Sequence, residues 1–209
     1  MDKTVLPLFL LGVAIALPAA AQDVQRTVIH AGHLIAEPGK PVRGASTIVV
    51  ENGRIVSIAD GHQPADPGAT LIDLKEKYVL PGLIDSHVHL TSDAGGLAGQ
   101  LEEVTLSPAA QAFNAEANAM KTLRAGFTTV RNLGDGDGAT LALRDAILAG
   151  KVRGPRIVDA GASISGTGGH MDGSLGYRDE LGPFFAGGSN TCNGARDCRR
   201  RGPLQIGRG

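Results

Sequence analysis

The stretch LPGLIDSHVHL, residues 80–90, decides how the rest of this sequence is interpreted. Its apolar residues are typical of a buried β-strand rather than a helix. Side chains two apart on a strand share a face, so Asp85, His87 and His89 are expected to project together. Imidazole nitrogens suit zinc, nickel, copper or iron, and a nearby carboxylate can orient a ligating ring. The segment therefore predicts half of a transition-metal site.

The spacing of the two histidines does not by itself prove a site. A His-x-His pair also occurs by chance, so a pair of ordinary histidines and a pair of metal ligands both stay open. The expected setting in a buried strand favours the metal, because burying two polar rings without partners is costly.

Four stretches of the chain resemble one family of enzymes. Residues 80–90 resemble the first barrel strand of the amidohydrolase superfamily, whose signature is Pro-Gly, two hydrophobic residues and Asp-x-His-x-His. The other three, in the expected order, are NGRIVSI (52–58), AGFTTVRNLGD (125–135) and GPRIVDAGASISGTGGHMD (154–172). Together they resemble the branch that contains imidazolonepropionase-like enzymes and metal-dependent Xaa-Pro dipeptidases. The resemblance runs from about residue 26 to about residue 195.

This resemblance implies a chemistry. In the family the first-strand histidines bind one metal and a modified lysine on the fourth strand bridges to a second, while two later histidines and a last-strand aspartate complete the site. It implies that His87 and His89 are ligands of a divalent metal, with Zn²⁺ expected and one or two ions in the intact enzyme. The later ligands and the base cannot be placed, so no catalytic residue is assigned.

The implied reaction is hydrolysis of a carbon–nitrogen bond in an amide, a cyclic amide or a dipeptide. The metal would lower the pKa of water toward about 7 and polarise the carbonyl. The implied partner is a small-molecule or dipeptide substrate, and a homo-oligomer of the intact enzyme is compatible with the resemblance. The alternative is a catalytically inert fragment that acts as a binding or interaction module.

The first 21 residues have the layout of a secretory signal peptide. Lys3 precedes an apolar core at residues 8–17, and the alanines at 19–21 offer a cleavage site before Gln22. The core is shorter than the roughly 20 residues that span a bilayer, although an uncleaved anchor or a buried helix stays open. We expect export to the periplasm or the extracellular space, without stable membrane insertion after cleavage.

Charge and aromatic content argue against a nucleic-acid partner. The chain has 20 Lys and Arg against 21 Asp and Glu, with two Tyr, five Phe and no Trp. It therefore offers neither a basic stripe nor much aromatic surface for base stacking.

Cys192 and Cys198 are the only cysteines. In an exported protein they can be oxidised, and the short segment between them can close a loop. A zinc site is the weaker interpretation, because neither a Cys-x-x-Cys pair nor a nearby histidine accompanies them. A local disulfide is favoured over free thiols.

Residues 22–79 are expected to form the N-terminal part of a small β-sandwich domain. The clearest signal is Asn52-Gly53 between the β-branched runs 47–50 and 55–58, which predicts a tight hairpin. Three histidines in this region, His30, His33 and His62, show no ligand-like grouping.

Residues 80–195 alternate between strands and helices and predict the N-terminal half of a (β/α)8 TIM barrel. The strands are expected at 80–90, 127–133 and 156–164. A first helix should start at Ser107-Pro108 and end at Gly126, and a second should be capped by Asp137. The residues expected to pack inward from the first helix are Phe113, Ala117, Met120 and Leu123. A whole barrel takes about 250 residues, so at most its first half is expected here.

Two features lie beyond the third strand. The glycine-rich loop 166–172 carries His170, either as a solvent histidine or, as the resemblance implies, as a substrate-binding residue facing the metal. The Arg-rich tail 196–209 contains Gly202-Pro203, which should break a helix, and is expected to be disordered.

Reacting groups in such barrels lie at the C-terminal ends of the strands. His87 and His89 end the first expected strand, Asp135 follows the second, and the loop with His170 follows the third.

Overall fold

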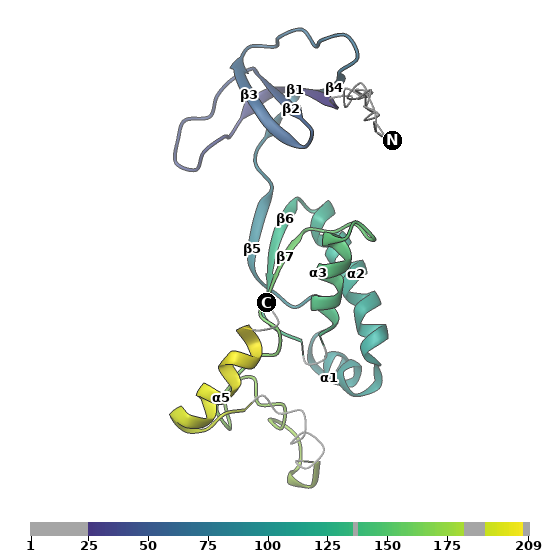
Figure 1. Ribbon diagram of the computed structural model, residues 1–209, viewed down its shortest axis with the longest axis vertical. Helices are drawn as coiled ribbons and strands as arrows, with labels where there is room; N and C mark the ends of the chain where they lie inside the picture. Colours follow the sequence, from purple (N-terminus) through teal and green to yellow (C-terminus); the bar gives the residue numbers. More distant parts are fainter. Residues whose placement is uncertain (1–24, 136–137, 182–190, 207–209) are drawn as a thin grey trace, which may run out of the picture. The chain divides into compact units, whose positions relative to one another are not determined.

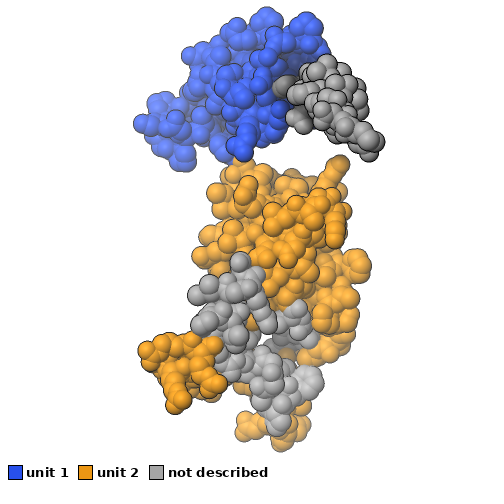
Figure 2. Space-filling model, viewed as in Figure 1, with its two compact units in different colours: residues 1–81 blue, residues 82–209 orange. Residues whose placement is uncertain are grey.

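The computed structural model describes residues 25–135, 138–181 and 191–206. They belong to two compact units, Met1–Pro81 and Gly82–Gly209, shown in different colours in Figure 2 and taken here one at a time. The signal peptide predicted at residues 1–21 lies outside the described residues, as does Asp137.

The first unit is built on one four-stranded sheet in the order β3-β2-β1-β4 (Figure 1). Its strands are β1 (Arg26–Leu34), β2 (Ser46–Glu51), β3 (Arg54–Asp60) and β4 (Thr70–Val79). Strand β1 pairs antiparallel with β2 and parallel with β4, and β2 pairs antiparallel with β3. The core of this unit contains Ala31, Leu34 and Ile48.

The hairpin between β2 and β3 is confirmed. Asn52 and Gly53 adopt positive φ angles of 48° and 77°. Two consecutive positive φ values are what a type I′ turn requires, and its twist matches that of the flanking strands.

The second unit alternates parallel strands with helices, as predicted. A three-stranded sheet in the order β5-β6-β7 contains β5 (Leu83–Val88), β6 (Phe127–Asn132) and β7 (Arg156–Asp159), all parallel. Its helices are α1 (Gly96–Thr105), α2 (Pro108–Arg124), α3 (Ala139–Leu148) and α5 (Gly194–Ile206), with a short 3₁₀ turn at Asp179–Leu181. Helices α2 and α3 lie on the same side of the sheet (Figure 1).

The buried face of α2 differs from the predicted one. Ala115 and Ala119 are fully buried against Val130 of β6, whereas Phe113 is 78% exposed. The 3.6-residue period fits both faces, and the small alanine side chains let the helix approach the sheet closely. The remaining buried members of this core are Leu90, Leu143 and Ile157.

The start of α2 follows the predicted chemistry, and the start of α3 is held by Asp135. Ser107 caps α2 by accepting the Ala110 N–H at 3.3 Å, as predicted. Helix α3 is capped by Asp135, whose carboxylate accepts the N–H groups of Ala139 (3.1 Å) and Thr140 (2.9 Å). A carboxylate in the loop after β6 thus reaches donors that have no partner within the helix, while Asp137, the residue predicted to cap it, lies outside the described residues.

Strand β5 is not the buried strand that its composition predicts. It lies at the edge of the sheet, and Ile84 is 71% exposed. An apolar run predicts burial on both faces only when both faces and both edges are covered, and in the described residues β5 has one neighbour.

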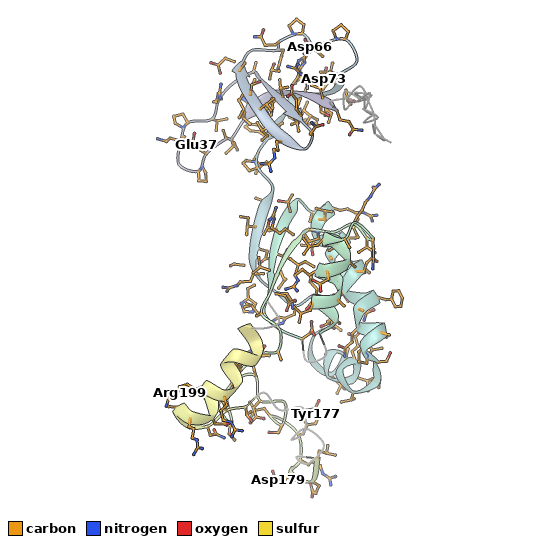
Figure 3. All side chains as sticks on the ribbon, in the orientation of Figure 1. Glu37, Asp66, Asp73, Tyr177, Asp179 and Arg199 are labelled. Carbon is orange, nitrogen blue, oxygen red and sulfur yellow. A yellow bond between two sulfur atoms is a disulfide. The ribbon has the colours of Figure 1, made fainter. Side chains whose placement is uncertain are left out.

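Residues 196–206 of the tail predicted to be disordered belong to helix α5, which continues through Gly202 and Pro203. Residues 207–209 lie outside the described residues. Its start is held by the Asp197 carboxylate, which accepts the Asn193 N–H at 3.0 Å, and by a disulfide between Cys192 and Cys198. Arg199, labelled in Figure 3, donates from Nε to the Ala195 carbonyl one turn earlier. These local restraints offset the poor helix propensity of Gly and Pro.

Candidate metal centre

His87 and His89 are placed at the C-terminal end of β5, where both side chains are exposed. Their ring centroids lie 5.4 Å apart and the rings are inclined by 68°. A tetrahedral zinc ion with Zn–N bonds of about 2.1 Å holds two imidazoles with centroids roughly 5 Å apart. The separation of the two rings therefore fits a shared metal ion.

A β-bulge lies between Asp85 and Val88 and includes His87. Asp85 pairs with Val130 and Val88 with Asn132, so β5 has one more residue than β6 in this interval. The strict alternation expected from the sequence does not hold across such an insertion. The Asp85 carboxylate accepts the backbone N–H of His87 at 3.0 Å, so it shapes the bulge instead of orienting a ring.

The ring of His89 is held by the loop after β6. Its Nδ1 lies 3.4 Å from the Gly134 carbonyl oxygen. A proton on Nδ1 donated to this carbonyl leaves Nε2 with a free lone pair, the arrangement in which imidazole binds metals. Gly134 itself has a φ of 125°, and a Cβ there would lie 2.3 Å from Ser163 Oγ.

Asn132, the last residue of β6, joins the ends of all three strands and was missed by the sequence reasoning. It is fully buried. Its Oδ1 accepts the Leu90 N–H at 3.1 Å, and its Nδ2 donates to Thr140 Oγ1 at 2.9 Å and to Asp159 Oδ2 at 3.1 Å. The sequence feature that could have pointed to Asn132 is a polar residue at the end of a strand in a parallel α/β pattern.

Asp135 does not act as a metal ligand in this arrangement. Both of its oxygens are taken by the start of α3, and Oδ2 also accepts the Thr140 hydroxyl. A carboxylate with this many donors is already satisfied. It anchors the helix that follows β6.

His170 stands exposed on the loop after β7, two residues before Asp172. The Asp172 carboxylate accepts the Gly168 N–H at 2.8 Å and both the N–H and the hydroxyl of Ser174. These donors lower the pKa of the Asp172 carboxyl, the Gly168 N–H most strongly. Within residues 138–181 and 191–206, no hydrogen bond of the His170 ring is present.

The segment that carries the disulfide is attached to the same loop. The Cys192 N–H donates to the Ser165 carbonyl at 2.7 Å. The Asn193 side chain accepts the Thr167 N–H at 3.2 Å and donates to its hydroxyl at 2.7 Å. The Cys192–Cys198 bridge therefore restrains a segment that borders the His170 loop.

The described residues contain no group of three or more His, Cys, Asp or Glu side chains that could hold a metal ion. The structure brings His87 and His89 together and adds no third ligand from the part of the chain that it describes. In that same part, no helix is long and apolar enough to cross a membrane.

Comparison with known proteins gives consistent matches. The model of the amidohydrolase family matches residues 78–200. Ochratoxinase from Aspergillus niger is 28% identical over 207 residues, which covers 91% of this chain and 42% of that protein. An enamidase from Eubacterium barkeri is 48% identical over a shorter stretch of 52 residues.

Solved structures give the same fold. A Xaa-Pro dipeptidase with bound methionine in its active site superposes with a TM-score of 0.77 at 32% identity, over 88% of this chain and 45% of that one. A prolidase complexed with N-methylphosphonate-L-proline gives a TM-score of 0.69 at 30% identity, over 88% and 45%. The predicted fold class is confirmed: the mixed α/β chain corresponds to part of a TIM barrel preceded by part of a β-sandwich. The chain spans less than half the length of these relatives.

Proposed function

Because this chain belongs to the amidohydrolase family, we propose that it supplies the first two metal ligands of a hydrolase that cleaves a carbon–nitrogen bond. The observation that carries the proposal is the pair of His87 and His89 rings, 5.4 Å apart at the C-terminal end of a parallel strand. That end of the strands is where α/β barrels hold their reacting groups.

The residues of the chain have distinct roles in this proposal. His87 and His89 hold a divalent ion, proposed to be zinc, and the Gly134 carbonyl fixes the tautomer of His89. When bound, the ion supplies Lewis acidity, which lowers the pKa of water toward about 7 and polarises a carbonyl. His170, on the loop after β7, contacts the substrate.

The proposed substrates are dipeptides that end in proline, or related small amides. Support comes from the similarity to a Xaa-Pro dipeptidase and to a prolidase complexed with a proline phosphonate. The similarity to ochratoxinase, spread over 91% of this chain, keeps other amides open. We further propose export to the periplasm or the extracellular space, which rests on residues 1–21 of the sequence.

Zinc titration of the isotope-labelled chain tests the metal ligands. We expect the ring resonances of His87 and His89 to shift together, and the shifts to disappear in the His87→Ala and His89→Ala variants. His33→Ala is the matched control, because His33 stacks on Tyr78 in the other unit, at 4.4 Å between centroids. Zinc shifts that survive both alanine substitutions would remove the basis of the proposal.

Hydrolysis of Xaa-Pro dipeptides with added zinc or manganese tests the reaction. Two neutral imidazoles leave the metal shell incomplete, so we expect turnover only in a protein that also supplies the later ligands. Saturable binding of a proline dipeptide to this chain, with no turnover in the protein that supplies the later ligands, would favour the catalytically inert binding module instead.

A further inference from the structure

We propose that Asn132 is a positioning residue that fixes the backbone at His89 and so aims its imidazole at the metal. The inference rests on the proposed function, because it concerns the same metal centre. It adds a residue that is neither a metal ligand nor in contact with the metal. The support is a chain of hydrogen bonds that converges behind His89.

The orientation of the Asn132 amide follows from its partners. The Leu90 N–H needs an acceptor, which must be Oδ1, and the Asp159 carboxylate needs a donor, which must be Nδ2. A flipped amide would place two donors together at Leu90 and two acceptors together at Asp159. The side chain is fully buried, so water cannot replace any of these bonds.

The hydrogen bond between Asn132 and Leu90 affects His89, the residue that precedes Leu90. The N–H of Leu90 belongs to the peptide plane that follows His89, so the bond from Asn132 fixes the rotation of that plane. On the other side of Leu90, Asn118 of α2 donates from Nδ2 to its carbonyl at 3.0 Å. Two asparagines thus hold both polar groups of Leu90, whose side chain is itself buried in the core.

His89 is consequently held at two points. Asn132 sets its backbone through Leu90, and the Gly134 carbonyl lies against its ring. The N–H of His87 is held by the Asp85 carboxylate within the bulge, but no hydrogen bond of the His87 ring is present in the described residues. We therefore expect the position of His89 to depend on Asn132, and that of His87 much less.

Three variants separate positioning from simple stabilisation. Asn132→Leu keeps the branched shape and the number of heavy atoms and removes every side-chain hydrogen bond. Asn132→Asp keeps an acceptor for the Leu90 N–H and loses the donor to Asp159. Thr140→Val is the matched control, because it removes one of the two partners of Asn132 Nδ2 in the same buried network and leaves the Leu90 bond intact.

The first measurement is made on the metal-free chain by NMR. In Asn132→Leu we expect the Leu90 amide to lose its protection from hydrogen exchange and the His89 side chain to sample several rotamers. Asn132→Asp and Thr140→Val should keep both features, even though all three variants lower stability. If Asn132→Leu does not fold, loss of the Leu90 protection or of the single His89 rotamer in Asn132→Asp overturns the proposal.

The second measurement is zinc affinity, read from the same ring resonances. Loss of a residue behind a metal ligand typically weakens binding by about 10- to 100-fold, and we expect Asn132→Leu to fall in that range. An unchanged His89 rotamer in Asn132→Leu, or an equal loss of affinity in Thr140→Val, overturns the inference. Absence of zinc binding in the unmodified chain would instead count against the metal centre, while the metal-free measurement still decides the role of Asn132.

Discussion

Gly134 occupies a position that only glycine fits. Its φ of 125° lies in the region that side chains rarely adopt, and an added Cβ would also approach the Gly161 carbonyl to 3.1 Å. The carbonyl of this same residue lies against the His89 ring. The backbone at Gly134 therefore links local conformation to the candidate metal ligand.

Substitution of this glycine should be costly. For Gly134→Ala we expect a loss of unfolding free energy above the roughly 1–3 kcal/mol that backbone strain alone costs, together with a shifted His89 resonance. Gly126→Ala is the control, because Gly126 has a φ of 99° with nothing within 4 Å of an added Cβ. If denaturant unfolding shows that the two variants lose the same unfolding free energy, the close approach of an added Cβ to Ser163 does not contribute to the loss.

Asp172 makes the loop around His170 sensitive to acid. The pKa of its carboxyl is lowered by the Gly168 N–H and then by the Ser174 hydroxyl and N–H. A pKa lower in the folded loop than in the unfolded chain stabilises the loop above the ordinary Asp pKa of about 3.9, and this stability is lost as pH falls through the folded value. We expect the His170 loop to keep its order from neutral pH to pH 4 and to lose it below.

Ser174→Ala provides the comparison for this titration. It removes one donor and leaves the Gly168 N–H, so the pKa of Asp172 should move up toward its ordinary value. Carboxyl chemical shifts followed across pH measure both proteins. A Ser174→Ala titration that coincides with the unmodified one would rule out the hydroxyl as a cause.

Among the helices, α2 shows what sequence periodicity can and cannot resolve. Its start at Ser107-Pro108 and its end before Gly126 follow from local cap chemistry and were predicted correctly. Its buried face was predicted wrongly, because the pair 113 and 117 has the same four-residue spacing as the pair 115 and 119. The choice between the two faces depends on the distance between helix and sheet, which the sequence of the helix does not contain.

Two substitutions test the assignment of that face. Ala119→Leu should lower the unfolding free energy by about 1–3 kcal/mol, because extra volume cannot be accommodated in a packed core. Phe113→Ser changes a side chain that is 78% exposed and should cost about 0.5 kcal/mol or less. Chemical denaturation followed through unit Gly82–Gly209 measures both, and a larger loss for Phe113→Ser would restore the face predicted from the sequence.

Helix α5 depends on restraints that propensity does not capture. We expect reduction of the Cys192–Cys198 bridge, or Cys198→Ser, to unwind its first turn, since Gly194, Gly202 and Pro203 disfavour a helix. The Asn193 contacts with Thr167 should weaken with it. Backbone chemical shifts before and after reduction measure the change, and mass spectrometry of unreduced peptides should show the two-hydrogen deficit of the bridge. A helix that persists unchanged in Cys198→Ser would show that the Asp197 cap suffices.

At the scale of the whole chain, the sequence predicted the order of elements and the pair of histidines. It did not reveal that Asn132 connects the ends of the three strands. The hydrogen bond from Leu90 to Asn132 joins residues 42 positions apart, and its partners become neighbours only when three parallel strands align. The sequence did not reveal the bulge in β5 either, because a bulge is defined by the register of β5 against β6.

The two compact units have separate cores, and this gives the last prediction. The core around Ala31, Leu34 and Ile48 draws its members from residues 29–79, and the core around Val130 draws its members from residues 88–157. Burial of apolar surface is the main favourable term in folding, so each core should govern the stability of its own unit. Leu34→Ala and Leu143→Ala each delete a buried side chain and should cost about 2–5 kcal/mol. We expect Leu34→Ala to destabilise only the unit Met1–Pro81 and Leu143→Ala only the unit Gly82–Gly209. Residue-resolved hydrogen exchange in denaturant measures the stability of each unit. Exchange that accelerates equally in both units for either variant would show that the chain unfolds as a single cooperative body.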